Sequence, residues 1–494
     1  MIKTILNSIT TSLGITSKLL PITKSEYLQF LACAPEFWLL KHHPEEFSGA
    51  PDEETRHIME QGYAIESLAR SYFKPSEELD IEFQCTFQSE RLLARADIIL
   101  TETSTGIKSL VEVKSGSKIK DEYYDDLAFQ MIAAEAVGVT FNQIGVLHIN
   151  SEYILSGELN VQELFTYKDV TEVVLALIPN TKINIEAAIE CLVQDEPVME
   201  LHEYCGQKLD CPAMQRHHPN LPSYNVFHVS RITSSPRKLQ ELLTRKIVDI
   251  GAIPKDFALT DRQRTQVNVA QSGNPIIKQN EIKKTLDGLQ FPLYFLDYET
   301  LQYGIPLYEG VKPYQQMVFQ WSLHVLYAID EEPVHLDFLS DGRSHPALEF
   351  VRTLHSCIPY NNGSLIVWNK SFEMTRNREL AEMYPNFEPF LTNINSRIFD
   401  LMEIFQQQHF VHPSFRGSCS IKDVLPVLAP HLSYNNLEVS HGMQAAICWF
   451  NIISNKIPEP QKTKMLQNLR RYCKLDTFAM VEIYNFLRNI AFVN

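Results

Sequence analysis

Two acidic residues and a lysine fall close together in the N-terminal third of the chain, in a stretch typical of β-strands. Asp97 interrupts the apolar run ARADIIL, and Glu112 and Lys114 stand two residues apart in LVEVKS. Residues two apart on a strand project from one face, so Glu112 and Lys114 are expected to point together. Asp97 and Glu112 would hold Mg²⁺ or Mn²⁺, and Lys114 would stabilise the charge that develops on a hydrolysed phosphate. The same pattern also fits a surface strand pair joined by a salt bridge.

A second acidic group lies in the C-terminal part of the chain. Asp297 and Glu299 alternate with apolar residues in LYFLDYET, which predicts both carboxylates on one face of a strand. Tyr472 and Asp476 stand four apart in RRYCKLDTF, one turn apart on a helix. An apolar strand does not bury two acids unless they are paired or bind a metal. A solvated helix face is the alternative for the tyrosine–aspartate pair.

Two further acids extend this second group. Glu373 is expected in the first turn of a helix that begins with the residues SFEMTR. Asp400, in RIFDLMEIF, is a weaker metal-ligand candidate. Carboxylates drawn from a first strand, a middle helix and a last helix suit a two-metal site. In such a site two ions about 3.5–4 Å apart clamp the attacking and leaving oxygens. Tyr472 would position the attacking water beside the scissile phosphate.

Three cysteines and a histidine form a third group. Cys33 precedes the first acidic group, whereas Cys205, Cys211 and His217 follow it in a polar segment, EYCGQKLDCPAMQRHH, that makes a poor core. Cysteine and histidine are the usual ligands of zinc. Small buried core residues are the alternative interpretation of these cysteines.

The periodicity of the chain predicts an α/β fold class with two domains that position these groups. In the first domain, helices are expected over 25–75 and 125–138, and strands at 81–88, 91–100, 109–115 and 143–150. In the second, strands are expected at 291–300, 316–329, 334–340 and 363–369, and helices at 371–384 and 466–490. The expected domain boundaries are 1–222, 223–288 for a helical connector, and 289–494.

Composition narrows the class of protein. The chain has 494 residues with 45% hydrophobic and 21% charged residues, which are globular proportions. It has no apolar run of about 18 residues and no signal-peptide pattern, so neither a membrane association nor secretion is expected. Nine cysteines without such a signal favour the cytoplasm. The net charge of −16 argues against a broad basic surface but leaves room for a basic groove.

The first acidic group resembles the PD-(D/E)XK nuclease superfamily in its RecB-like branch, over residues 25 to about 220. Asp97 matches the first acid of that family, and Glu112-Val113-Lys114 matches its signature triplet. Gln130 and Glu66 match a glutamine and an additional ligand of the RecB-like branch. The resemblance implies a restriction-endonuclease-like domain with a catalytic magnesium or manganese site.

The cysteine group resembles that of the iron–sulfur-staple nucleases, in which four cysteines hold a [4Fe–4S] cluster. Here three cysteines are present, and His217 stands where the fourth is expected. The resemblance leaves three states open: a cluster with three cysteines and one histidine, zinc in its place, or a lost metal site held by packing.

The second acidic group resembles the DEDD exonucleases of the ribonuclease H-like fold. Asp297 and Glu299 match the first motif of that family, and Tyr472 with Asp476 matches the last. The middle motif, Asn-x-x-Phe-Asp, is present as Asn369 to Glu373, with Glu in place of Asp. The whole chain also resembles an uncharacterised bacterial family that joins these two modules.

These observations predict a metal-dependent nuclease that cleaves phosphodiester bonds of DNA or RNA, with two carboxylate sites and 3′–5′ exonuclease-like chemistry in the second. The alternative is a nucleic-acid binding or adaptor protein in which one or both sites are inactive. Hydrolysis of a small nucleotide is a third, weaker possibility. The sequence does not distinguish DNA from RNA, and it identifies no protein partner.

Overall fold

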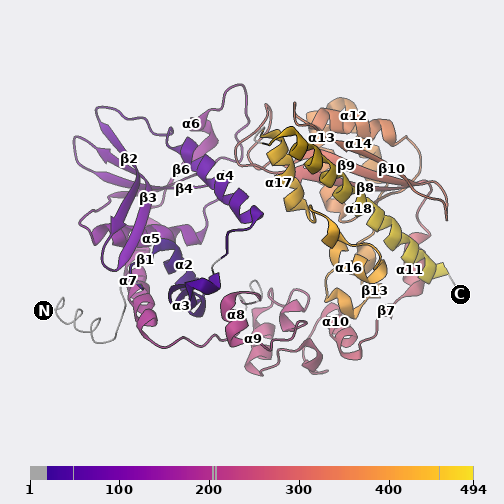
Figure 1. Cartoon of the computed structure of the whole chain (residues 1–494), viewed down its shortest axis with the longest axis horizontal. Helices are drawn as coiled ribbons and strands as arrows, with labels where there is room; N and C mark the ends of the chain where they lie inside the picture. The colour runs from indigo at the N-terminus through magenta and orange to yellow at the C-terminus, as the bar shows by residue number, and fades with distance from the viewer. Residues whose placement is uncertain (1–18, 48, 203–204, 206–208, 455–456, 493–494) are drawn as a thin grey trace. The chain divides into compact units, whose positions relative to one another are not determined.

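The computed structural model places the chain in two compact units (Figure 1). The first comprises Met1–Asn220 with Tyr303–Tyr314, and the second comprises Leu221–Gln302 with Gln315–Asn494. The structure describes residues 19–47, 49–202, 205, 209–454 and 457–492. Residues 1–18, where a signal peptide would begin, therefore lie outside the described residues.

The observed units differ from the expected boundaries in two places. The helical connector expected at 223–288 belongs to the second unit, and Tyr303–Tyr314 belongs to the first although it follows residue 289. Segment 303–314 is joined to the rest of the first unit by backbone hydrogen bonds between Leu155 and both Gly310 and Val311. Local sequence patterns carry no information on such a long-range contact.

The first unit is built on a six-stranded mixed sheet. Its strands are β1 (Ile22–Thr23), β2 (Leu79–Gln88), β3 (Leu92–Glu102), β4 (Lys108–Lys114), β5 (Gln143–Ile149) and β6 (Phe165–Asp169). The order is β1-β3-β4-β5-β6 with β2 paired to β3; β4 and β5 are parallel, and β2, β3 and β4 form an antiparallel meander. The helices are α2 (Lys24–Ala32), α3 (Ala34–His42), η1 (Pro44–Phe47), α4 (Glu53–Ala69), α5 (Asp121–Glu135), α6 (Val161–Leu164), α7 (Thr171–Val193) and α8 (Pro212–His217).

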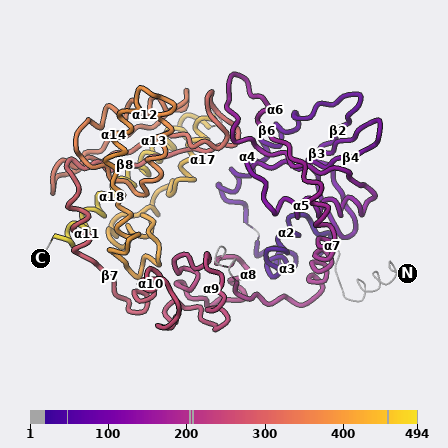
Figure 2. The backbone as a smooth tube through the Cα atoms, turned by 180° about the vertical axis from the view of Figure 1, so that it is seen from behind, coloured from indigo at the N-terminus to yellow at the C-terminus, as the bar shows by residue number. Residues whose placement is uncertain are grey.

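Strand β4 shows why this sheet is covered on both faces. Leu110 joins a core cluster with Leu127 and Phe129 of α5, whereas its neighbour Val111 joins the opposite cluster with Ile65 of α4. Alternate residues of a strand face opposite sides, so both faces of β4 need apolar cover. Figure 2 shows α5 and α7 side by side, and they pack against each other. The expected strands and helices of this unit are present.

The second unit holds a five-stranded sheet with the order β10-β9-β8-β11-β12. Strands β8 (Leu293–Leu301), β9 (Met317–Leu326) and β10 (Val334–Leu339) form an antiparallel meander, and β11 (Leu365–Val367) is parallel to both β8 and β12 (Ile398–Asp400). β7 (Ile276–Ile277) and β13 (Phe410–Val411) form a separate pair. The longer helices are α9 (Pro236–Thr244), α10 (Asp261–Ser272), α11 (Gln279–Leu286), α12 (Ala347–Cys357), α13 (Lys370–Met383), α14 (Glu388–Ser396), α16 (Ile421–Leu428), α17 (Gly442–Ile453) and α18 (Glu459–Phe492). Short helical turns are η3 (Val226–His228), η4 (Ile250–Ala252), η5 (Pro385–Phe387), α15 (Glu403–Gln406), η6 (Pro413–Phe415) and η7 (Tyr434–Asn436).

The two faces of β8 differ in chemistry. Leu296 and Tyr298 join an apolar core with Phe350 of α12. Asp297 and Glu299 alternate with them and pair in register with Ser322 and Gln320 of β9. Helix α18 covers this polar face, because Gln320 Nε2 donates to Leu469 O and Ser322 bonds Thr477. The mixed α/β class is therefore present in both units, and within the described residues no helix is both long and apolar enough to cross a membrane.

Candidate active sites

The N-terminal site is organised around Glu112 of β4. Its Oε1 accepts hydrogen bonds from Lys114 Nζ at 2.9 Å and from Lys24 Nζ at 2.7 Å, and its Oε2 accepts one from Gln130 Nε2 of α5 at 2.8 Å. Glu112 and Lys114 share a strand face as their spacing predicts. Gln130, the glutamine that the family resemblance indicates, donates to the same carboxylate.

Lys24 and Asp126 complete this site and were missed by the sequence argument. Asp126 accepts from Lys114 Nζ at 2.7 Å and from Gln130 Nε2 at 2.9 Å. Asp126 precedes Gln130 by four residues, so helical spacing would have placed it on the same face. Lys24 follows Thr23, which forms a capping box with Glu26, and the TKSE pattern would have located this helix start.

Asp97 lies where the β2–β3 ladder is interrupted. The ladder passes from Phe83–Ile98 to Cys85–Ala96, and Gln84 between them has φ of 55°. Gln84 Nε2 donates to Asp97 Oδ1 at 3.2 Å and to Glu66 Oε1 at 2.6 Å. The second oxygen of Asp97 accepts from Val113 N at 2.8 Å.

Glu66 of α4 is linked to the N-terminal site through Gln84. It also accepts a hydrogen bond from Arg70 at 3.0 Å, one turn along the same helix. The structure therefore brings together the N-terminal acids, the lysine and the glutamine predicted from the sequence.

The charges of the N-terminal site are unevenly compensated. Burial disfavours ionisation of Glu112, yet Lys114 and Lys24 lower its pKa to about 2. Burial and the nearby Glu112 raise the pKa of Asp97 to about 7. The pKa of Lys114 lies above its usual range, since Glu112 and Asp126 outweigh its desolvation. Asp97 accepts its hydrogen bonds from an amide group and a backbone N–H group, and Lys24 only partly offsets the rise of its pKa, so a metal there would supply compensating charge.

The C-terminal site gathers acids from three elements. Asp297 and Glu299 come from β8, Glu373 from the first turn of α13, and Asp476 from α18. The four carboxyl groups influence one another electrostatically: Asp476 and Glu373 both act on the pKa of Glu299, and Asp297 acts on that of Glu373. Tyr472 is buried and belongs to the same cluster.

Buried oxygens of this cluster lack partners. Glu373 is 1% exposed and Asp476 8%, and Glu373 Oε2 and Asp476 Oδ2 have no hydrogen-bond partner among the described residues. Burial raises the pKa of Asp476 to about 7 and raises those of Asp297, Glu299 and Glu373 well above their usual range. Buried acids without compensating charge are costly, so the cluster is suited to divalent cations.

Tyr434 and Lys422 were not predicted for this site. Tyr434 OH donates to Asp476 Oδ1 at 2.6 Å. Lys422 Nζ lies 5.8 Å from the ring centre of Tyr434 and 6.0 Å from that of Tyr472, and its charge lowers the pKa values of Glu299 and Asp476. Both residues are distant in sequence from the motifs, which gave no signal for them.

Asp400, the weaker metal-ligand candidate, positions the backbone before α13. Its carboxylate accepts three backbone hydrogen bonds at 3.0 Å, from Asn369, Lys370 and Met402. These bonds hold Asn369 in a left-handed conformation, φ 82°, immediately before α13. Both oxygens are engaged by backbone N–H groups, so these contacts support a structural role, and metal binding by Asp400 stays a prediction. Asp400 fixes the start of the helix that carries Glu373.

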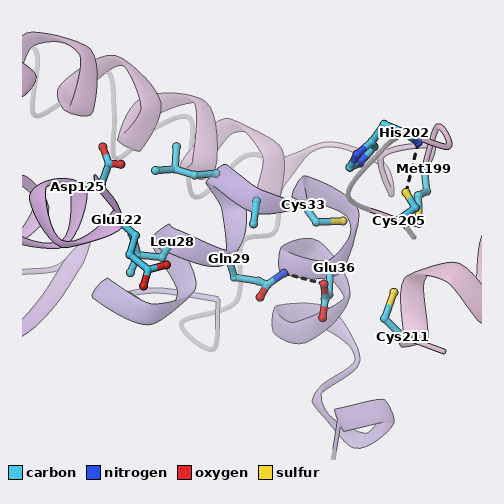
Figure 3. Close-up of a pocket in the computed structure, with 12 residues that line it drawn as sticks. Leu28, Gln29, Cys33, Glu36, Glu122, Asp125, Met199, His202, Cys205 and Cys211 are labelled. Atoms are coloured by element: carbon cyan, nitrogen blue, oxygen red, sulfur yellow. Dashed lines mark hydrogen bonds between the residues drawn. The ribbon is translucent and has the colours of Figure 1, made fainter. Parts of the chain in front are cut away.

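The three predicted cysteines line one cavity of about 390 Å³ (Figure 3). Cys33 lies at the junction of α2 and α3, Cys205 follows α7 in the sequence, and Cys211 is the N-cap residue of α8. His202 lines this cavity, whereas His217 is absent from the described lining and lies 2.9 Å from Glu196 Oε1. His202 is therefore a further candidate beside the three cysteines, whereas the ring of His217 lies next to a carboxylate and its role as a ligand stays a prediction.

The chain is similar to a domain family and to several bacterial proteins. A family model described as a domain of unknown function, DUF2779, matches residues 294–420, a span that contains Asp297, Glu299 and Glu373 and ends before Asp476. The uncharacterized protein UU173 of Ureaplasma parvum is 24% identical over 302 residues, 55% of this chain and 42% of that protein. The uncharacterized protein MG366 of Mycoplasma genitalium is 25% identical over 227 residues, 43% of this chain and 34% of that protein. The chain thus spans less than half the length of these relatives.

Proposed function

We propose that the protein is a metal-dependent nuclease that hydrolyses phosphodiester bonds of DNA or RNA. The observation that carries this proposal is the C-terminal cluster of Asp297, Glu299, Glu373 and Asp476. Glu299, Glu373 and Asp476 are buried and Asp297 is partly buried. The four acids come from three elements and include two buried oxygens that have no hydrogen-bond partner among the described residues. Such a cluster is electrostatically unfavourable on its own and favourable around divalent cations.

The donor set fits Mg²⁺ or Mn²⁺, since it consists mainly of carboxylate oxygens. When bound, such ions activate water and stabilise charge on a phosphate. Tyr434 orients Asp476 by occupying Oδ1, which leaves Oδ2 for a cation. Asp400 holds the α13 start that carries Glu373. Lys422 and Tyr472 adjoin the acids, where they would bind the phosphate and the attacking water.

We propose a ribonuclease H-like fold of DEDD exonuclease type for this second unit. The strand arrangement supports it, because β9 runs against the other strands of a mixed five-stranded sheet. Asp297 and Glu299 lie on the central strand of that sheet, and Asp476 lies on the helix that covers their face. The site would remove nucleotides from 3′ ends.

For the first unit we propose a PD-(D/E)XK fold of the RecB-like branch. The succession α4, β2, β3, β4, α5, β5 supports it, with an antiparallel meander followed by a parallel strand. Asp97 and Glu112 would hold the cation, and Lys114, fixed between Glu112 and Asp126, would present its ammonium to the phosphate.

The cysteine cavity is proposed to hold a [4Fe–4S] cluster, or zinc in its place. Backbone N–H groups of His202 and Met214 lie 3.4 Å from the sulfurs of Cys205 and Cys211, contacts that tune sulfur ligands of clusters. Within the described residues these cysteines form no set with ligand atoms all within 4.8 Å.

One observation favours the alternative of a binding or adaptor protein for the first unit. Both oxygens of Glu112 already have lysine or glutamine partners, so this carboxylate needs a metal less than the C-terminal acids do. In that case the first unit would bind nucleic acid through its lysines, while the second would carry the chemistry.

A nuclease assay tests the proposal. The full chain, purified without oxygen, is incubated with Mg²⁺ or Mn²⁺ and end-labelled single- and double-stranded DNA and RNA. Lys114→Ala, Asp297→Ala and the double variant are compared with wild type, and Asp256→Asn, a change at an exposed residue, is the control. Loss of distinct activities in the two single variants is expected. Absence of cleavage by wild type on all substrates would reject the nuclease proposal in favour of the binding protein.

A further inference from the structure

Cys473 lies inside the C-terminal acidic cluster, where a core cysteine would ordinarily face apolar atoms. It is fully buried, and its Sγ lies 3.7 Å from Asp297 Oδ2. Asp297, Glu299 and Cys473 form the one set of three potential ligands, within the described part of the chain, whose ligand atoms all lie within 4.8 Å of one another. That separation is close to the span of two ligands about one ion at 2.0–2.3 Å.

We propose that Cys473 is a ligand of the cation held by Asp297 and Glu299, and that it makes this site select a softer transition-metal ion such as Co²⁺ or Zn²⁺ over Mg²⁺. This inference rests on the metal site of the proposed function. Sulfur is a soft ligand that favours such ions, whereas carboxylates alone suit Mg²⁺. The thiol would thus determine which metal supports cleavage.

A second observation points to a ligand at the same place. Asp476 follows Cys473 by three residues on α18, so both side chains project from neighbouring positions of one helix face. The buried Oδ2 of Asp476 has no partner among the described residues. The cluster also contains Glu373 Oε2, which is likewise unpartnered. These oxygens provide further donors for an ion that the sulfur would bind.

The proton balance of this binding is simple. In the metal-free protein the thiol donates its hydrogen to Asp297. When the sulfur binds the cation, the S–H proton is released to solvent, a metal–sulfur bond forms, and no electron is transferred. The alternative role for Cys473 is that of a hydrogen-bond donor that only orients Asp297. A serine at this position keeps such a donor and removes the soft ligand.

Titration of the metal-free full chain with Co²⁺ alone separates these roles, because thiolate–cobalt charge-transfer absorption reports a sulfur ligand without any nuclease reaction. Wild type is compared with Cys473→Ser, Asp297→Asn and Cys448→Ser; Cys448 is a matched control because it is buried in α17 and bonds Met465 O. We expect Cys473→Ser to lose the absorption component. Asp297→Asn, which keeps the thiol, should show it only with about 10–100-fold weaker Co²⁺ affinity, and Cys448→Ser should retain it with the affinity of wild type.

The two proposals fail in different ways. A spectrum of folded Cys473→Ser identical to that of wild type would overturn the ligand role, whether or not wild type cleaves nucleic acid. A component that depends on both Cys473 and Asp297 supports the ligand role even in a protein without cleavage, in which case the nuclease proposal alone fails. In an active protein, Cys473→Ser should lower the ratio of Co²⁺- to Mg²⁺-supported rates by about tenfold; an unchanged ratio would contradict the proposed selectivity.

Discussion

Removing the charge of Asp476 should stabilise the metal-free protein in a pH-dependent way. Burial raises the pKa of Asp476 from 3.8 to about 7 in the folded protein. Between these values the folded state binds more protons than the unfolded state, so stability falls as pH rises through this window. A difference of one between the two pKa values corresponds to about 1.4 kcal/mol. Between pH 5 and pH 8, Asp476 alone should lower the free energy of unfolding by at most about 3 kcal/mol.

The variant Asp476→Asn isolates this effect. Its amide oxygen can still accept the hydrogen bond from Tyr434, whereas the charge is absent. The difference in unfolding free energy between the metal-free variant and wild type should therefore shift in favour of the variant from pH 5 to pH 8, by up to about 3 kcal/mol. Mn²⁺ at pH 8 should stabilise wild type more than the variant, because the variant lacks one carboxylate ligand.

Urea unfolding in the presence of a chelator measures this difference. Tryptophan fluorescence is suitable because Trp321, Trp368 and Trp449 all belong to the second unit. Asp256→Asn removes an exposed charge from the same unit and should give a pH-independent difference. A pH-independent difference for Asp476→Asn as well, or equal stabilisation of variant and wild type by Mn²⁺, would refute the reasoning.

Three further perturbations follow from individual contacts. Tyr434→Phe leaves a buried oxygen of Asp476 without its donor and should cost about 1–3 kcal/mol in urea unfolding; no loss would show that water replaces the hydroxyl. Asp400→Ala removes three backbone hydrogen bonds and should lower the free energy of unfolding by about 3 kcal/mol. Calorimetry should also show a lower metal affinity at the C-terminal site, and an unchanged affinity would contradict the positioning role of Asp400. Lys24→Met should raise the pKa of Glu112 from about 2, measured by NMR titration, since one of its two lysines is lost; an unchanged value would assign the whole effect to Lys114.

Local sequence patterns determined the pairs of residues that share one element. The two-residue repeat of a strand placed Glu112 beside Lys114 and Asp297 on the face of Glu299, and the observed strands β4 and β8 carry both pairs. The hydrophobic patterns also predicted the α/β class and the principal elements, because periodicity reflects which faces are buried. Such patterns are local, so a single sequence is sufficient to recognise them.

Only the tertiary structure decided which elements meet. Lys24 reaches Glu112 across 88 positions, and Cys473 reaches Asp297 across 176. Contacts at such separations depend on the path of the chain, which no periodicity encodes. The same reason explains why His202 and not His217 lines the cysteine cavity, and why Asp400 accepts hydrogen bonds from backbone N–H groups. The sequence therefore determined the chemical groups and their local faces, whereas folding determined their partners.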